Sequence, residues 1–280
     1  PNALGQLARS FDDTAYYRTI GNFYVNWEII EGLSFKSQYS IYFSSYENNW
    51  FAPDYYIEET DKRVINSVGR IHNNKTNTTW NNFAAYTKDF GEHSLNVMGG
   101  IVLESQLHKT LSAQAENTPS NHPDLRYLDA ATEAYFASGN NEQYNLISYI
   151  ARANYSYKDK YLLTATARAD GSSLFPDGNK WGVFPSVSLG WVVSDETFMK
   201  DVKWIGFFKT RLGWGQIGND NRNSIPIDAR LTTIGNEYYS SGANQNLLIG
   251  TAPDNVGNPN IKWETVEDLN FGIDLALFEN

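Results

Sequence analysis

The sequence predicts an all-β fold that forms part of a large antiparallel transmembrane β-barrel. Two observations lead to this class. Apolar and polar residues alternate with period 2 in segment after segment, whereas the 3.6-residue period of a helix is almost absent. Short and long connections also alternate strictly, so short turns lie at one end of the strands and long loops at the other, as in outer-membrane barrels.

About nine segments carry the strand pattern, and two of them form the clearest hairpin. In that hairpin, a turn at Lys158–Lys160 places Tyr157 opposite Tyr161 and Ala153 opposite Ala165, so the two apolar faces coincide. The nine segments are Thr14–Ile30, Leu33–Tyr46, Thr76–Asp89, Ser94–Leu107, Leu146–Tyr157, Tyr161–Asp170, Trp181–Ser194, Phe207–Ile217 and Lys262–Ala276. Thr76–Asp89 alternates least, and its two faces stay unassigned.

The connections are of two kinds. The short ones are Glu31-Gly32, the turn around Gly91, Lys158–Lys160 and Asp195–Lys203, the last with room for one helical turn. The long ones are about thirty residues after Tyr46, a similar stretch after Leu107, ten residues at Gly171–Lys180 and more than forty at Gly218–Ile261. Loops beyond about 12–15 residues are uncommon in compact domains, and a soluble sandwich gives no reason for all of them to lie at one end.

The first and last predicted strands have no neighbour on their outer sides. Unpaired backbone groups in hydrocarbon each cost several kcal/mol, so a membrane sheet cannot end in open edges. We therefore expect residues 1–280 to be a partial barrel domain, a fragment of a larger closed barrel.

Composition excludes several classes of protein. The 280 residues are 41% hydrophobic, which is too much for a disordered chain, and the absence of Cys excludes disulfide scaffolds, zinc ribbons and thiol nucleophiles. A net charge of −10 without a Lys/Arg cluster argues against nucleic acid as a partner. The mean hydropathy of −0.48 is no objection to a membrane barrel, because a spanning strand needs only about 9–11 residues, half of which face a polar lumen.

The short motifs give no catalytic, cofactor or metal site. Gly213–Gly218 fits the dinucleotide pattern G-x-G-x-x-G, but a turn-rich loop follows it instead of the helix that would hold the pyrophosphate. The oxygens of Asn219–Asn223 suggest calcium, yet the spaced Gly and terminal Glu of a calcium loop are missing. His72, His93, His108 and His122 lack metal-ligand spacing.

One stretch resembles a known family. From Lys160 to Trp191 the chain reads KYLLTATARADGSSLFPDGNKWGVFPSVSLGW, and the segments Leu212–Gln216 and Asn258–Glu264 follow in matching order. These segments resemble the SusC/RagA family of TonB-linked outer-membrane transporters of Bacteroidetes. Leu174 stands where that family commonly has Arg, a departure that leaves the fold unaffected.

The resemblance implies the architecture and the partners of the whole transporter. It implies a barrel of about 22 strands in the cell outer membrane, an N-terminal plug, and a SusD-like surface lipoprotein that closes over the extracellular mouth. TonB would pull on the plug, through regions absent from this chain. The outer-membrane lipid would cover the wall, and the substrates would be oligosaccharides or peptides, between which the sequence does not decide.

Charged residues within the strands fall on the face opposite the apolar one. Because an Arg or Lys facing lipid at the membrane midplane costs about 2–4 kcal/mol, these side chains are predicted to face the lumen. They would line the transport path or hold the wall to the plug. The predicted lumen-facing residues are Arg152, Arg168, Lys209, Arg211 and Asp268. Pro185 cannot donate to a ladder, so we expect it near a rim with a local break in pairing.

The aromatic residues fall into two groups. Those within strands, such as Tyr149, Tyr161 and Trp191, suit the lipid face and its interfacial girdles. Others lie in predicted extracellular loops, where they would stack on sugar or peptide or contact the lid. The favoured interpretation is that they only pack the loops together. The candidates for substrate or lid contact are Trp50, Tyr55, Tyr56, Tyr238 and Tyr239.

Two other classes stay open at this point. A soluble β-sandwich that binds carbohydrate or acts as an adhesin would use the same loop aromatics. A β-rich glycosidase comes third, and it would need two carboxylates about 5–9.5 Å apart. If the chain were such a sandwich, its apolar strand faces would converge on a shared dry interior.

Overall fold

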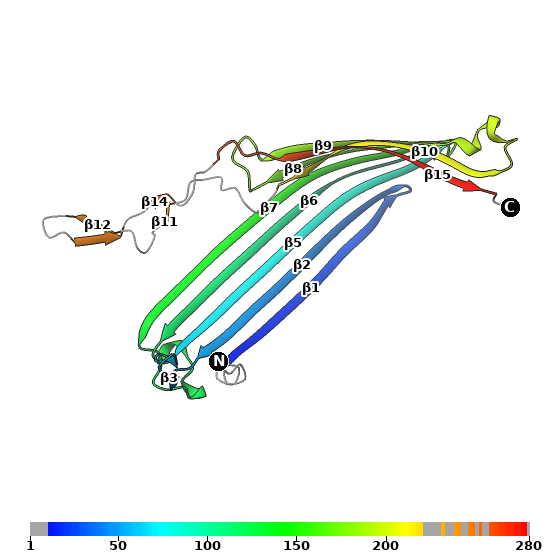
Figure 1. Cartoon of the computed structure of the whole chain (residues 1–280). Coiled ribbons are helices and arrows are strands. Elements are labelled where there is room, and N and C mark those ends of the chain that lie inside the picture. Colours follow the sequence, from blue (N-terminus) through cyan, green and yellow to red (C-terminus); the bar gives the residue numbers. More distant parts are fainter. Residues whose placement is uncertain are drawn as a thin grey trace. The chain divides into compact units, whose positions relative to one another are not determined.

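Nine long strands of the computed structural model form one antiparallel sheet in which neighbours follow the order of the chain (Figure 1). They are β1 (Phe11–Ile30), β2 (Leu33–Ala52), β5 (Ser67–Phe90), β6 (His93–Glu116), β7 (Glu133–Tyr157), β8 (Tyr161–Ser172), β9 (Trp181–Val192), β10 (Ile205–Asn219) and β15 (Glu264–Leu277). The number and order of the predicted strands are confirmed.

The structure describes residues 11–220 and 258–278, and between them only the backbone of four short strands. These are β11 (Leu231–Thr232), β12 (Tyr238–Ser241), β13 (Asn246–Ile249) and β14 (Ala252–Pro253). The described residues divide into two units, which are treated separately below. The first lies within Pro1–Tyr24, Gln38–Trp80 and Glu104–Tyr144, and the second within Val25–Ser37, Asn81–Leu103 and Asn145–Asn280.

The short turns lie where the sequence predicts them. Gly32 and Gly91 have φ angles of 80° and 64°, a left-handed conformation that glycine adopts without steric cost. In the third turn the same region is occupied by Lys158 and Asp159, with φ angles of 55° and 54°. The register of this hairpin is the predicted one, with Tyr157 opposite Tyr161. We call this end of the sheet the short-turn end and the other the long-connection end.

Two of the long loops are shorter than predicted, because the strands on either side of them run further than expected. β2 continues past Tyr46 to Ala52 and β6 continues past Leu107 to Glu116, while β5 and β7 begin at Ser67 and Glu133. Outside an apolar band both faces of a strand meet water, so alternation fades while the backbone ladder continues. The remaining β2–β5 connection holds a small hairpin of β3 (Tyr55–Glu58) and β4 (Asp61–Arg63).

The other connections contain short 3₁₀ turns. The β6–β7 connection holds η1 (Pro123–Leu125) and η2 (Leu128–Ala130). The fourth short connection holds η3 (Val193–Asp195) and η4 (Thr197–Met199), in the place where one helical turn was expected. Among the described residues, no helix combines the length and apolar character needed to cross a membrane.

The register of β7–β10 and β15 separates two faces. One cross-strand row contains Arg152, Thr166, Ser186, Gly215 and Asp268, and the next row contains Ala153, Ala165, Val187, Trp214 and Leu269. Directly paired residues point to the same side, whereas neighbours along a strand point to opposite sides. We call the two sides the polar face and the apolar face.

The apolar face is exposed rather than buried. Leu189 is 52% exposed and Ile273 is 55% exposed. A soluble sandwich would bury these side chains against a second sheet, so the alternative of a sandwich with a shared dry interior is wrong for the part of the chain that the structure describes. In the first unit, a small buried cluster of Phe51, Val68, Ala115 and Ala131 packs with Leu128 of the β6–β7 connection.

Pro185 marks the expected interruption of pairing. It lies opposite Ala167 of β8, but the pairing of β9 with β10 covers only Ser186 to Val192. The missing N–H of proline therefore falls next to the point where the β9–β10 ladder ends, and the predicted local break is confirmed. The expected position near a rim is wrong, because Pro185 is two residues from Val187, which pairs with Ala165 in the middle of the apolar face.

Candidate functional site

The five charged residues predicted to face a lumen all lie on the polar face. The register puts Arg152 and Asp268 in one row with Thr166 of β8 and Gly215 of β10. Arg168 is two residues from Thr166, and Lys209 and Arg211 are six and four residues from Gly215, so all three point to the same side. Arg211 Nη2 donates to Asp274 Oδ1 at 2.9 Å, and Lys209 is paired with Asp274 in the register. Opposite charges thus pair on this face, as expected of a surface that meets water rather than hydrocarbon.

Arg168 is the most tightly held of the five. Its Nε lies 2.8 Å from each carboxylate oxygen of Asp170, and its Nη2 donates to Ser148 Oγ at 3.1 Å. Asp170 is 6% exposed and Ser148 is fully buried. A buried carboxylate needs such a partner, because leaving it unpaired would cost several kcal/mol. Arg168 therefore helps to hold the wall together at the long-connection end.

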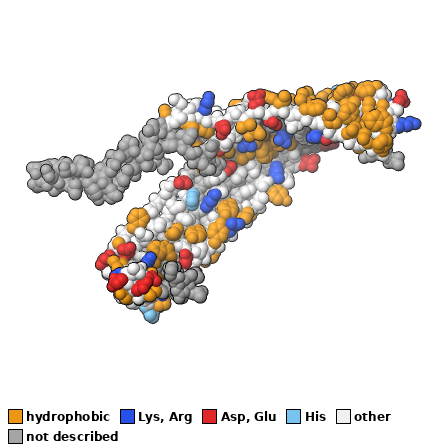
Figure 2. Space-filling view, viewed as in Figure 1, with side chains coloured by type: hydrophobic (Ala, Val, Ile, Leu, Met, Phe, Trp, Pro, Cys, Tyr) orange, Lys and Arg blue, Asp and Glu red, His pale blue; other side chains and the backbone are white. Residues whose placement is uncertain are grey.

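A ladder of stacked rings follows the short-turn end in the second unit. Successive ring centroids are 5.2 Å apart for Phe90–His93, 4.7 Å for His93–Tyr157, 6.1 Å for Tyr157–Tyr161 and 6.5 Å for Tyr161–Trp191. Hydrophobic side chains crowd this end, at the right of the space-filling view (Figure 2). Aromatic rings of this kind suit the boundary between hydrocarbon and water.

A second aromatic pair lies further along the same strands. Tyr149 stacks on Trp181 with centroids 5.7 Å apart. Tyr149 and Tyr157 share the apolar face of β7 and are eight residues apart, which is about 26 Å along the strand. For a strand tilted by about 40° this spans about 20 Å along the membrane normal, close to the roughly 25 Å apolar band of outer-membrane barrels.

Glu196 anchors the aromatic ladder in the connection between η3 and η4. Its Oε1 accepts hydrogen bonds from the Tyr161 hydroxyl at 2.6 Å and from Trp191 Nε1 at 3.1 Å, and Lys160 Nζ lies 3.5 Å from Oε2. The hydrogen bond from Tyr161, then that from Trp191, lower the pKa of the Glu196 carboxyl below its usual value. The ionised carboxylate therefore orients two rings of the ladder.

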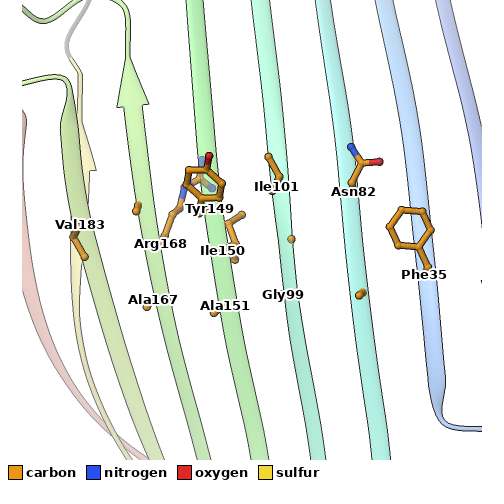
Figure 3. A pocket seen from close by; sticks show the side chains of 13 residues that line it. Phe35, Asn82, Gly99, Ile101, Tyr149, Ile150, Ala151, Ala167, Arg168 and Val183 are labelled. Atoms are coloured by element: carbon orange, nitrogen blue, oxygen red, sulfur yellow. The ribbon is translucent and has the colours of Figure 1, made fainter.

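A shallow trough of about 620 Å³ lies on the apolar face between the two aromatic levels. Its floor consists of small residues on adjacent strands, including Ala167, Ala151 and Gly99, with Val183 on one side and Phe35 on the other (Figure 3). Nothing in this lining suggests catalysis. A smooth apolar hollow of this kind fits the acyl chains that cover a membrane protein.

The segment that resembles the SusC/RagA family folds into a compact corner at the long-connection end. Phe175 packs on Trp263 with centroids 5.2 Å apart, and Trp263 meets the edge of Phe184 at 5.3 Å. A side chain at Gly182 or Gly218 would collide with the Phe184 ring. Trp263 Nε1 donates to the Lys180 carbonyl at 2.9 Å, which ties the start of β15 to the β8–β9 connection.

The predicted contact aromatics are spread over different environments. Trp50 lies in β2, not in a loop, and its half-buried ring covers Gly69. Tyr55 and Tyr56 lie in β3, where Tyr56 is 64% exposed and its ring lies 5.8 Å from Lys62 Nζ. Their role in binding stays a prediction. The backbones of Tyr238 and Tyr239 belong to β12, and their side chains lie outside the described residues.

Metal-ligating side chains do not gather in the described ranges. No group of three His, Asp or Glu residues lies close enough to hold a metal ion between residues 11 and 220 or 258 and 278. His72 pairs with Glu47 at 3.4 Å and His122 with Asp124 at 3.6 Å, each as an isolated pair.

One polar cavity in the first unit was not found from the sequence. Arg70 and Arg126 line it together with Tyr127, although the two arginines are 56 residues apart and belong to no motif. The signal that could have indicated it is weak: Arg126-Tyr127 is a cation–aromatic dipeptide in a long connection.

Comparisons with known proteins cover the whole chain. The family described as "TonB dependent receptor-like, beta-barrel" matches residues 2–280. TonB-dependent receptor P3 of Formosa agariphila is 32% identical over 279 residues, which are 100% of this chain and 27% of that protein. TonB-dependent receptor SusC of Bacteroides thetaiotaomicron is 33% identical over 210 residues, 74% of this chain and 20% of that protein.

Solved structures support the fold. The RagAB peptide transporter matches with a TM-score of 0.84 at 17% identity, covering 97% of this chain and 29% of that one. The RagAB peptide importer in its open-open state gives a TM-score of 0.83 at 18% identity. The chain thus spans about a quarter of the length of the proteins it matches.

Proposed function

The chain belongs to the TonB-dependent receptor β-barrel family, and on this premise we propose that it forms part of the barrel wall of a SusC-like outer-membrane importer. Residues 1–280 would be a partial barrel domain within a closed barrel of about 22 strands. The plug and the segment that meets TonB would belong to parts of the protein outside this chain.

The observation that carries the proposal is the division of the sheet into two faces. The apolar face is exposed over the described strands and is bounded by aromatic rings at two levels about 20 Å apart. The polar face carries Arg152, Arg168, Lys209, Arg211 and Asp268. An exposed apolar band on one side and paired charges on the other suit a wall between lipid and a water-filled lumen.

The names of the relatives support a proposal for the substrate class and the partner. One relative is named SusC, and the solved neighbours are structures of the RagAB peptide transporter. We accordingly propose that the intact protein imports oligosaccharides or peptides under a SusD-like surface lipoprotein, with energy from TonB. Tyr55 and Tyr56, in the hairpin beyond the end of β2, are our candidates for contact with substrate or lid.

Two measurements on the intact protein test the proposal in turn. The protein should be recovered in detergent-extracted outer membrane and should migrate anomalously on gels unless boiled. Recovery as a soluble monomer would reject the proposal that the chain forms part of a barrel wall. Cells lacking the protein should then lose uptake of one class of labelled substrate, oligosaccharide or peptide, and cells lacking TonB should show the same loss. Uptake that persists in both strains would reject the import function.

A further inference from the structure

A polar cavity of about 370 Å³ lies at the long-connection end of β1, β2 and β5 in the first unit. This volume is within the range of about 300–1,000 Å³ typical of small-molecule sites. Side chains from three strands and from the β6–β7 connection line it. They are Phe11, Asp13, Asn49, Arg70, Pro123, Arg126 and Tyr127.

Both guanidinium groups in this cavity are held in fixed positions. Arg126 donates through Nε and Nη2 to the Asn121 carbonyl at 3.1 and 3.0 Å, and its guanidinium carbon lies 4.9 Å from the centre of the Phe51 ring. Arg70 Nη2 donates to the Arg126 carbonyl at 2.9 Å, and its guanidinium lies 5.9 Å from the Tyr127 ring. Such groups lose little freedom when a ligand binds, which favours affinity.

Neither arginine has a carboxylate partner within the described ranges. Their hydrogen bonds within these ranges go to backbone carbonyls, so each guanidinium keeps N–H donors that no described residue uses. Among the described residues, Asp13 is the carboxylate that lines the cavity, and no ion pair joins it to either arginine. Two arginines that line one cavity without a carboxylate partner among the described residues favour an anion that can accept several N–H bonds.

The aromatic and amide groups narrow the class of anion. Tyr127 is 56% exposed and Phe11 is 41% exposed, and a guanidinium lies over each ring, that of Arg70 at 5.9 Å and that of Arg126 at 5.5 Å, so each ring keeps only part of its surface for a ligand. Sugar rings have apolar faces that pack on aromatic rings, while the Asn49 amide and the Asp13 carboxylate suit hydroxyl groups.

The strand pattern shows on which side the cavity opens. Asn48 donates to Asp12 Oδ1 and to Thr14 Oγ1, and Gln38 donates to Asn22, so these residues lie on one face of β1 and β2. Phe11, Asp13 and Asn49 alternate with them and lie on the other face, which further along β2 carries the exposed rings of Tyr39 and Phe43. Asn49 is six residues beyond Phe43, about 15 Å along the membrane normal for a strand tilted by about 40°.

We propose that this cavity, the two-arginine cavity, binds an acidic sugar that carries a carboxylate or a phosphate. The proposal rests on the proposed function, because it takes the apolar face as the membrane side and so places the cavity just above the outer leaflet. The acidic sugar has two possible sources. It belongs either to a glycolipid of the outer leaflet or to a free acidic oligosaccharide at the cell surface.

Binding to the intact, detergent-purified protein tests the proposal. The probes are trigalacturonate, neutral maltotriose, an acidic tripeptide, and vesicles that contain lipopolysaccharide. Arg70→Gln and Tyr127→Ala should each weaken binding of the acidic sugar about tenfold or more, since a hydrogen bond to a charged group is lost or a ring surface is removed. Arg63→Gln is the matched control: it removes the same charge from β4, outside the cavity.

Each outcome decides one point. Binding of trigalacturonate or of the vesicles, weakened by both variants and not by Arg63→Gln, supports the site. The probe that binds identifies the source of the acidic sugar. The proposal is overturned if neither trigalacturonate nor the vesicles bind, or if maltotriose binds as well as trigalacturonate. It is also overturned if the Arg63→Gln control loses as much binding as the two variants, or if the tripeptide binds better than the acidic sugar. Heat-modifiable migration of each variant shows that the barrel is intact. Failure of that migration in the wild-type protein would reject the proposed function instead.

Discussion

A charge introduced at the centre of the apolar face should be far more costly than the same charge one residue away. Ala165 lies four residues from Tyr161 and four from Ala169, which is paired with Tyr149. It therefore lies about 10 Å from each aromatic level along the membrane normal, at the midplane of the apolar band. Its neighbour Thr164 points to the polar face, where its hydroxyl donates to Asn154 Oδ1 at 2.9 Å.

The expected magnitude follows from that placement. Ala165→Arg should destabilise the assembled protein by about 2–4 kcal/mol, and Thr164→Arg by less than about 1 kcal/mol. The first corresponds to a decrease of about thirtyfold or more in the folding equilibrium. The assay is denaturant unfolding of the intact protein in phospholipid vesicles, followed by tryptophan fluorescence, with the assembled fraction in cells as a second readout. Equal costs for the two variants, or a greater cost at Thr164, would refute the assignment of the two faces.

Three further expectations concern labelling, packing and pH. In this cysteine-free chain, Arg152→Cys should react quickly with a hydrophilic thiol reagent and Ala151→Cys slowly; the reverse order of rates would invert the two faces. Gly218→Val should destabilise the corner by about 1–3 kcal/mol because the new side chain would collide with Phe184, and an unchanged unfolding midpoint would contradict this packing. The lowered pKa of Glu196 means that its ionised form adds stability above the ordinary value of 4.5, a contribution lost as pH falls through the lowered pKa. The variant Glu196→Gln should therefore flatten the acid side of the stability profile, and a profile that keeps the wild-type slope would count against the role of this carboxylate.

The sequence predicts the membrane band of the fold well and the part beyond it poorly. Within the band, strands other than β5 have one clearly apolar face, so alternation indicates both the strand and its register, as in the hairpin that pairs Ala153 with Ala165. Beyond the band both faces are polar. The ends of β2 and β6 therefore carry no periodic signal, although their backbone ladders continue to Ala52 and Glu116. Trp50 was assigned to a loop for this reason.

The candidate sites divide in the same way. The charged residues of the polar face could be grouped from the sequence because strand parity alone decides on which side Arg152 and Asp268 lie. The two-arginine cavity could not, because it depends on how the β6–β7 connection folds back over Phe51. No period or motif in the sequence encodes that contact, since Arg70 and Arg126 meet only through tertiary packing.

The residues that carry the family resemblance explain why it identifies the fold and not the substrate. Asp170 is buried against Arg168, Phe175 packs on Trp263, and the Phe184 ring lies where a side chain at Gly218 would be. These contacts close the corner between β8, β9 and β15, so each residue is constrained by its neighbours whatever passes through the lumen. Ligand preference must then come from positions that such packing leaves free. The exposed ring of Tyr127 is such a position for the acidic sugar, because it lies beside two arginines that have no carboxylate partner among the described residues.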